Sequence, residues 1–242
     1  MIKFFRHIRQ RLVKENKFSK YLLYAIGEII LVVIGILIAL QINNWNENKK
    51  SKKDEHYVLN EVLKNLEEDT VLVDAIITQR KKAKNSIISL EKFSDTQIWK
   101  TDSVQFHLVH LLTFERYFPI NNAYEILKSK GLQLADNNLT TKISRYYDYE
   151  QPKIGRSILD IEVAILNIYN GEQSIIRFLS LFNKDKRILI KNPDDPLFKE
   201  ELSSFLLAFQ DNNAGTLDKL LVFRNTNKEL REQITVALKK LD

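Results

Sequence analysis

The pattern of apolar positions changes character once along the chain, near residue 42. Residues 21–42, YLLYAIGEIILVVIGILIALQI, form a nearly unbroken apolar run that contains one ionisable residue, Glu28, and no proline. At about 1.5 Å rise per residue, a helix of this length spans a hydrocarbon core of about 30 Å. The run therefore predicts one transmembrane helix.

Beyond this run, apolar residues recur every three or four positions, which is the period of amphipathic helices. The longest such pattern predicts a helix from about Asn48 to about Phe93. Eight of its ten positions are apolar, and the exceptions are Asp69 and Arg80. The pattern fits either a coiled coil between chains or a helix within its own bundle; the polar exceptions and additional apolar neighbours favour the bundle. The ten positions, called the seam below, are Leu59, Val62, Leu66, Asp69, Val73, Ile76, Arg80, Ala83, Ile87 and Leu90.

Shorter helices are predicted in the middle of the chain. Thr101 or Asp102 caps a helix that runs to about Phe114, and a helix from Asn122 is ended by Gly131 as its C′ residue. A further helix runs from about Asn138 towards Pro152, which, like Pro119, marks a turn or hinge. It carries a cluster of tyrosines whose hydroxyls we expect to reach polar partners in the bundle: Tyr146, Tyr147 and Tyr149.

The C-terminal part predicts three more helices. The first spans about residues 153–182, with a kink or break at Asn170-Gly171, and residues 183–195 form a loop. Asp195 and Pro196 have the residue types of a helix cap and a first helical position. One helix carries the apolar stripe from Phe198 to Phe209, and a last helix runs from about residue 216 to 241.

These elements predict an all-α protein with four consecutive regions. Residues 1–20 form a basic amphipathic cytoplasmic segment, and residues 21–42 form the transmembrane helix. Residues 43–56 are a juxtamembrane connector, and residues 57–242 form one extracytoplasmic helical bundle, which is long enough to bury a core of its own.

Charge supplies the orientation. Residues 1–20 contain seven basic side chains and one acid, Glu15, whereas four lysines follow the apolar run at residues 49–53. The positive-inside rule places the N-terminus in the cytoplasm and the C-terminal domain in the periplasm, with the protein in the inner membrane. Tyr21 and Tyr24 at one end of the run and Trp45 at the other are the expected interfacial anchors.

The apolar run is expected to remain as an uncleaved anchor. It is longer than the hydrophobic region of a signal peptide, and it lacks an A-x-A-like cleavage site at its end. The basic N-terminal segment either lies on the anionic inner leaflet or is a flexible stub that only sets topology. A nucleic-acid partner is not expected for so short a basic arm.

Three residues of the run are candidates for contact within the membrane. Gly35 and Ala39 form a small-xxx-small pair that allows two helices to approach closely. A carboxylate at the depth of Glu28 is costly unless it is protonated, paired or facing protein. Glu28 therefore reaches back to the headgroups, contacts another helix, or belongs to a proton or ion pathway.

Two stretches resemble a known family. Residues 15–47, ENKFSKYLLYAIGEIILVVIGILIALQINNWNE, are similar to the N-terminal signature of uncharacterised single-pass inner-membrane proteins of Bacteroidota. Residues 122–148, NAYEILKSKGLQLADNNLTTKISRYYD, are similar to the central segment of that family. The resemblance implies one transmembrane helix and an extracytoplasmic helical domain, and it supplies no catalytic residue, ligand or reaction.

The search for chemistry yields no catalytic, cofactor-binding or metal site. His107 and His110 have the spacing of half a metal site, but no Glu-x-x-His motif accompanies them, and packing explains them better. Nucleotide-binding and hydrolase motifs and cysteines are absent from the sequence. Solvation explains the carboxylates of residues 67–69 and 194–195.

We therefore expect a membrane-anchored interaction, accessory or sensory protein without cofactors. Its partners are the lipid bilayer and either another protein or further copies of itself, bound through the transmembrane helix or the long first helix. A structural homo-oligomer, such as a stalk or a channel-associated subunit, is the alternative, and an unrecognised enzyme is the third possibility.

Overall fold

The computed structural model describes residues 18–95, 100–131, 134–170, 174–182 and 187–241. The chain divides into two compact units, Met1–Glu55 and His56–Asp242, called the N-terminal and C-terminal units below. One helix, α2 (Phe18–Asp95), contributes to both units. Most of the predicted amphipathic segment of residues 1–20 lies outside the described residues.

In the N-terminal unit, α2 carries the apolar run with its large side chains exposed. Leu23 is 75% and Leu31 66% exposed, and none of the most apolar stretch is buried inside the protein. The helix is long and apolar enough to cross a membrane. Its apolar character is therefore not accounted for by packing within the described part of the chain.

The helix continues through residues 43–56 without a break, so the predicted helix start near Asn48 is wrong. The sequence there contains neither proline nor glycine, and nothing in it forces the helix to end. Asn43 Nδ2 donates a hydrogen bond of 2.9 Å to Glu47 Oε1 one turn further on. The connector is helical rather than irregular.

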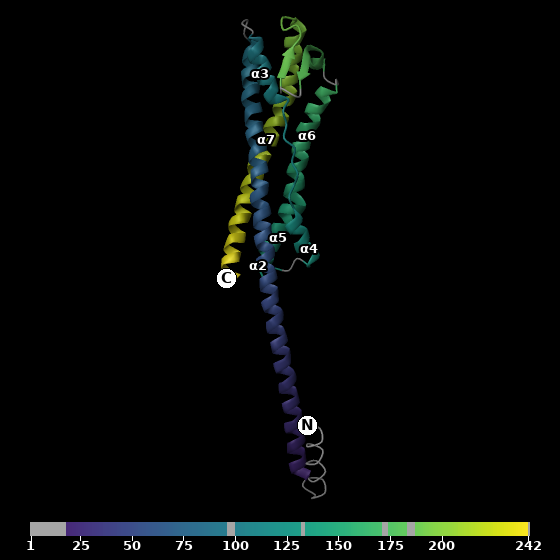
Figure 1. Ribbon diagram of the computed structural model, residues 1–242, viewed down its shortest axis with the longest axis vertical. Coiled ribbons are helices and arrows are strands. Elements are labelled where there is room, and N and C mark those ends of the chain that lie inside the picture. Colours follow the sequence, from purple (N-terminus) through teal and green to yellow (C-terminus); the bar gives the residue numbers. More distant parts are fainter. Residues whose placement is uncertain (1–17, 96–99, 132–133, 171–173, 183–186, 242) are drawn as a thin grey trace. The chain divides into compact units, whose positions relative to one another are not determined.

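The C-terminal unit is mainly helical (Figure 1). After α2 come α3 (Thr101–Leu111), α4 (Asn122–Ser129) and α5 (Asn137–Arg145). A π-helical turn, η1 (Tyr146–Glu150), leads into α6 (Gln151–Tyr169), which is followed by the 3₁₀ turn η2 (Ser174–Phe178). Two short strands, β1 (Leu179–Phe182) and β2 (Arg187–Ile190), precede the last helix, α7 (Pro196–Leu241).

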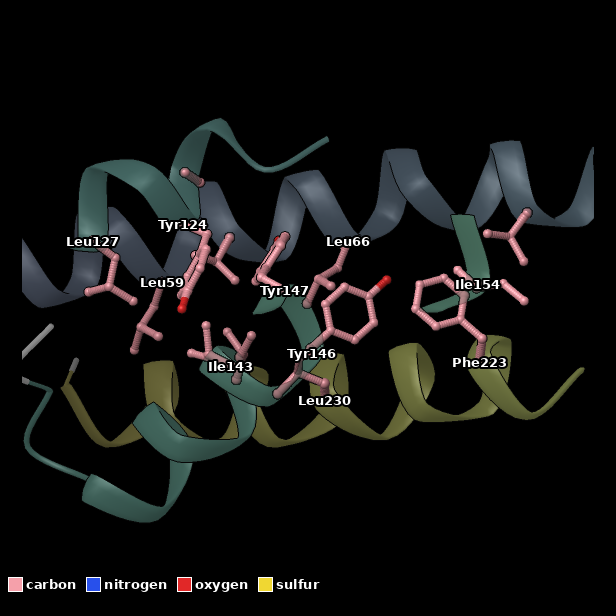
Figure 2. Packing of buried hydrophobic residues seen from close by; sticks show 14 of the residues in the cluster. Leu59, Leu66, Tyr124, Leu127, Ile143, Tyr146, Tyr147, Ile154, Phe223 and Leu230 are labelled. Atoms are coloured by element: carbon pink, nitrogen blue, oxygen red, sulfur yellow. The ribbon is translucent and has the colours of Figure 1, made fainter. Parts of the chain in front are cut away.

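All ten seam positions of α2 are buried, at no more than 3% exposure. They pack within the chain's own bundle, as the wider apolar stripe predicted. The hydrophobic core has two clusters. One joins α2 to α4, α5, η1 and the C-terminal half of α7, and Figure 2 shows Leu66, Tyr146 and Leu230 meeting there. The other joins the C-terminal end of α2 to α3, α6, the hairpin and the N-terminal half of α7.

The predicted helix of residues 153–182 is correct only up to the break at Asn170. Residues 179–182 instead pair antiparallel with residues 187–190, so part of the predicted loop 183–195 is a strand. Ile188 and Ile190 are buried while Leu189 is 45% exposed, which is the alternation of a strand covered on one face. Four residues of this alternation are too few to distinguish from a helix end by sequence.

The two predicted C-terminal helices are one helix, α7, of 46 residues. Gly215 and the polar residues 210–213 lie between the two predicted helices. The buried face nevertheless keeps its three- and four-residue steps through Asn213, Thr216 and Leu217. A glycine in a helix costs only about 1 kcal/mol relative to alanine, which packing along the whole helix offsets.

Pro152 does not interrupt the chain as a hinge, because α5, η1 and α6 follow one another directly. The π turn immediately before it uses longer hydrogen-bond steps, and Gln151 N donates to Tyr146 O. Pro119 does lie in irregular chain, between α3 and α4.

Several helix ends follow the predicted chemistry. Gly131 has a φ of 85° at the C′ position of α4, a conformation that suits glycine. Asp195 Oδ1 accepts from Leu197 N at 3.0 Å at the start of α7, where Pro196 is the first residue. The N-cap of α3 is Lys100, without a side-chain hydrogen bond, rather than Thr101 or Asp102.

Candidate functional site

The segment between α3 and α4, residues 112–121, is the most unusual part of the bundle and is called the strap below. Side chains of α2 hold it on one side and side chains of α6 on the other. Arg80 binds the carbonyl of Thr113 and Asp69 binds the hydroxyl of Tyr117. Asp69 and Arg80 lie eleven residues, or about 16 Å, apart along α2, and residues 113–121 form no regular secondary structure.

Arg80 of α2 anchors the start of the strap. Its Nη2 donates to Thr113 O at 2.6 Å, and its Nη1 lies 3.5 Å from Asn213 Oδ1 of α7. The neighbouring Gln79 Nε2 donates to His110 O and Thr113 O, both at 3.1 Å. Burial lowers the pKa of Arg80 to about 10, while Glu115 opposes this shift, so the guanidinium remains charged at neutral pH.

Asp69 anchors the middle of the strap and joins it to the core. Tyr117 donates to its Oδ1 at 2.7 Å and Tyr146 to its Oδ2 at 2.6 Å. Asn227 of α7 in turn donates to the hydroxyl of Tyr146 at 2.9 Å. Burial raises the pKa of Asp69, and the hydrogen bonds from Tyr146, Tyr117 and Gln151 counteract part of that shift. In the described part of the chain, no cationic side chain pairs with this carboxylate.

The side of the strap that faces α6 is held by three further contacts. Tyr169 donates to Leu112 O at 2.9 Å, and Arg116 Nε donates to Glu162 Oε1 at 2.8 Å. Gln151 Nε2 reaches Ile120 O at 3.4 Å. Most of the hydrogen bonds that hold the strap are accepted by its main-chain carbonyls. Polar residues of α2 and α6 therefore fix the main chain of the strap.

The π turn η1 supplies Tyr146 to this network. Tyr146 and the next residue, Tyr147, are both buried in the core. Tyr147 stacks on Tyr124 with ring centroids 4.8 Å apart (Figure 2), and Tyr124 donates to Asp148. Burial is the main cause that raises the pKa values of Tyr117, Tyr146 and Tyr147, so these phenols stay protonated. Tyr117 and Tyr146 donate to Asp69, whereas the buried hydroxyl of Tyr147 has no hydrogen-bond partner in the described part of the chain, contrary to the expectation from sequence.

His107 and His110 meet a single hydroxyl rather than a metal ligand set. Ser86 Oγ lies 3.1 Å from His107 Nδ1 and 3.0 Å from His110 Nδ1. Burial lowers the pKa of both imidazoles, aided for His107 by His110 and for His110 by Lys82. No group of three or more metal-ligating side chains occurs among the residues that the structure describes.

Two adjoining hollows lie on the surface between α5 and α7, with volumes of about 500 and 190 Å³. They share Lys142, Glu229 and Gln233. Acidic and basic side chains are mixed along both, for example Glu232 and Lys240 in the larger one. The lining therefore favours neither an anionic nor a cationic ligand.

The membrane-contact residues predicted from sequence lie in the N-terminal unit. Glu28, Gly35 and Ala39 are spaced by seven and four residues, so they share one face of α2. A Cβ atom added at Gly35 would meet nothing within 4 Å, so this face is open. Trp45 is exposed and Lys49 Nζ lies 5.2 Å from its ring centre. The side chain of Tyr21 lies outside the described residues, while Tyr24 is half-buried.

The strap and its anchors were not predicted. The expectation that Asp69 is solvated like Glu67 and Glu68 is wrong, because it is 1% exposed. The available signal was its position: Asp69 and Arg80 occupy seam positions, where a polar residue must be buried and therefore bonded. The bonding partners in the strap and in α7 could not be found from spacing alone.

Comparison with known proteins gives a family without an assigned activity. Residues 28–163, more than half of the chain, match the model of a family described as "Family of unknown function (DUF6090)". No curated protein and no solved structure matches the chain.

Proposed function

The chain belongs to the family of unknown function DUF6090, and we propose that this member is a membrane-anchored interaction protein. One observation carries the proposal: a single helix, α2, contains both the exposed apolar run and the buried seam of the bundle. The same helix would thus be the anchor in the bilayer and the central element of the extramembrane domain. Anything that binds the bundle would be held at the membrane.

The polar groups of the bundle support an interaction role over catalysis. Asp69, Arg80, Tyr117 and Tyr146 form their hydrogen bonds with one another, with the strap and with α7. Asp69, Arg80 and Tyr146 are also buried away from the surface, where a substrate would have to reach them. A protein that binds partners through its outer surface does not need these buried polar groups for binding. Their role is then to hold the strap in one conformation.

The charge distribution supports an inner-membrane protein with its N-terminus in the cytoplasm and its bundle in the periplasm. A reporter that is active only in the periplasm, fused after Asp242, should be active. Protease added to spheroplasts should remove the C-terminal unit. Activity of a cytoplasmic reporter at the same position would reverse the proposed orientation.

The interaction itself is tested by crosslinking in intact membranes, purification in detergent and mass measurement of the complex. A defined complex with a second protein, recovered again after reconstitution from purified components, is the expected result. A closed complex of this chain alone would replace the proposal with a structural homo-oligomer. A monomer that forms neither complex would contradict it.

The face that carries Glu28, Gly35 and Ala39 is the proposed contact surface within the membrane. We expect Glu28→Leu to insert normally, because it removes a carboxylate that costs about 2–3 kcal/mol in a membrane helix. The same change should lower the yield of crosslinked complex, and Glu28→Gln should retain part of it by hydrogen bonding. Unchanged crosslinking in both variants would instead indicate that Glu28 reaches the headgroups.

A further inference from the structure

The helical segment that follows the apolar run has two chemically different faces. At about 100° per residue, Lys49, Lys50, Lys52 and Lys53 fall within an arc of about 160°, and Trp45 lies within the same arc. These five residues are called the lysine face below. Glu47 and Asp54 lie just outside this arc, about 60° and 40° from Lys50. Asn43 donates to Glu47. Because α2 is continuous here, the separation of the two faces is fixed by the helix.

The four lysines have no carboxylate partner in the described part of the chain. All are exposed, and the contact formed by the face is that of Lys49 with the ring of Trp45, at 5.2 Å from the ring centre. Four neighbouring ammonium groups repel one another, and their helical positions hold them together. This arrangement favours an anionic surface as the partner over a single carboxylate.

The position of the lysine face selects the kind of anionic surface. Lys49 lies seven residues beyond Ile42, or about 10 Å along the helix from the end of the apolar run. The headgroup layer on each side of a bilayer is about 5–8 Å thick. The long lysine stems can place their ammonium groups back towards that layer, and an indole ring at the position of Trp45 lies within it.

We propose that the lysine face binds the phosphate groups of anionic phospholipids in the leaflet nearest the bundle. This inference rests on the proposed membrane anchor. Trp45 would lie at the level of the glycerol backbone, and the lysines would contact phosphates around the helix. The lipid contact would limit the rotation and tilt of α2 at the membrane surface, because only one face of the helix attracts the headgroups.

The test uses the full chain reconstituted into phosphatidylcholine bilayers that contain a trace of spin-labelled lipid. Comparing the motionally restricted fractions of spin-labelled phosphatidylglycerol and spin-labelled phosphatidylcholine gives the relative affinity for the anionic lipid. We expect a preference of about five-fold for phosphatidylglycerol, roughly the effect of one lysine near an anionic surface. High salt should reduce this preference, because exposed charges are screened.

The variant Lys49→Gln with Lys53→Gln should show a smaller preference than the native chain, by the part that the lysine face contributes. The matched control, Glu47→Gln with Asp54→Asn, changes two charges outside the lysine face on the same turns and should retain it. Helicity and melting measured by circular dichroism should be the same for all three proteins. Both variants keep the basic residues 1–20, so binding by that segment is common to them.

Three results would overturn the assignment. The native chain could show no preference for the anionic lipid, or the lysine variant could keep it. The control could also change the preference as much as the lysine variant does, which would indicate an effect of net charge alone.

Loss of a crosslinked protein partner in the lysine variant, with the lipid preference unchanged, would assign the face to an acidic protein. If the chain does not float with the vesicles at all, the membrane anchor itself is wrong.

Discussion

Asp69 and Arg80 occupy positions on the same buried face of α2 and have opposite charges, yet they do not pair. Eleven residues, or about 16 Å, separate them along the helix. Each is instead neutralised locally by dipoles: the carboxylate by two phenol hydroxyls, and the guanidinium by carbonyl and amide oxygens. Buried ions are costly without such partners, so the two residues stabilise the fold only when the strap is in place.

The titration of Asp69 should make stability depend on pH. Its folded pKa is raised above its unfolded value, so its stabilising contribution is complete below the unfolded pKa and is lost as the pH rises through the folded pKa. The variant Asp69→Asn does not titrate. The unfolding free energy of the native protein should therefore exceed that of the variant most at about pH 4 and least at about pH 7.

Urea denaturation of both proteins across this pH range, followed by circular dichroism, measures the difference. The phenols of Tyr117 and Tyr146 do not contribute to it, because burial raises their pKa values far above the range tested. A difference that grows as the pH rises would contradict the raised pKa of Asp69.

The contact of Arg80 with the strap should control how often the strap opens. Arg80→Met keeps the length of the side chain but removes the donor to Thr113 O, and should cost about 1–3 kcal/mol. Opening exposes the bond after Arg116, so trypsin should cleave the variant faster at that bond. The rate is followed by mass spectrometry of the fragments.

Arg224→Met is the matched control. Arg224 Nε lies 2.6 Å from Asp74 Oδ1 in an exposed ion pair on the same bundle, which is worth less than about 1 kcal/mol. It should leave cleavage after Arg116 unchanged. Equal cleavage in the native protein and Arg80→Met would mean that Gln79 and Tyr117 hold the strap without Arg80.

Among the elements, the π turn η1 joins α5 to α6 without a break and carries two buried tyrosines, Tyr146 and Tyr147. Along this stretch the buried positions are Ile143, Tyr146, Tyr147, Gln151 and Ile154. The five-residue step from Tyr146 to Gln151 is the step of a π turn. In a regular α-helix a five-residue step would place Gln151 about 140° around the axis from Tyr146.

A π turn behaves as one inserted residue, so removing one residue should restore a regular helix in the same register. Deletion of the exposed Tyr149 reduces the step from Tyr146 to Gln151 to four residues. We expect the bundle to remain folded, with a loss of about 1–2 kcal/mol for the altered contacts. The deletion is made together with Pro152→Ala, because proline in a regular helix interior costs about 3 kcal/mol.

Deletion of Val163, with the same Pro152→Ala change, is the control. Val163 is also exposed but lies in the regular part of α6, where loss of a residue rotates all later positions by about 100°. The control should lose its cooperative thermal transition in circular dichroism. Similar stability of the two deletions would show that the π turn does not absorb a residue.

At the scale of the whole C-terminal unit, the strap is a non-helical segment that lies among helices. The long elements α2, α6 and α7 form the bundle, and the strap runs between α2 and α6 (Figure 1). Residues 113–121 of the strap are half-buried or exposed, and without regular secondary structure they do not bond their own carbonyls in a repeating pattern. The inner faces of α2 and α6 therefore carry the donors Gln79, Arg80, Gln151 and Tyr169 among apolar residues.

Because the C-terminal unit has its own core, it should fold without the apolar run. A fragment of residues 55–242 should be a helical monomer or weak dimer by circular dichroism and light scattering. Leu66→Asp should unfold it, because Leu66 is fully buried and a buried unpaired charge costs several kcal/mol. Glu67→Gln, at the exposed neighbour, should leave the melting temperature unchanged, and an unchanged melting temperature in Leu66→Asp would contradict the burial of the seam.

The sequence by itself determined the features that depend on local pattern. The apolar run, the seam and its burial, the C′ position of Gly131 and the start of α7 at Pro196 each follow from a few neighbouring residues, because helical periodicity and backbone conformation are local properties. The function class and the orientation are predictions of the same kind, drawn from charge and composition, and they stay predictions.

Tertiary structure decided what the local pattern left open. Residues 179–182 carry a pattern that suits a helix end, and they become a strand because residues 187–190 supply a partner at the edge of the core. Gly215 lies inside one continuous helix because packing along α7 outweighs its low propensity. Asp69 is buried because Tyr117 and Tyr146, 48 and 77 residues away, bring their hydroxyls to it. Such partners are set by the closure of the bundle, and no short stretch of sequence contains them.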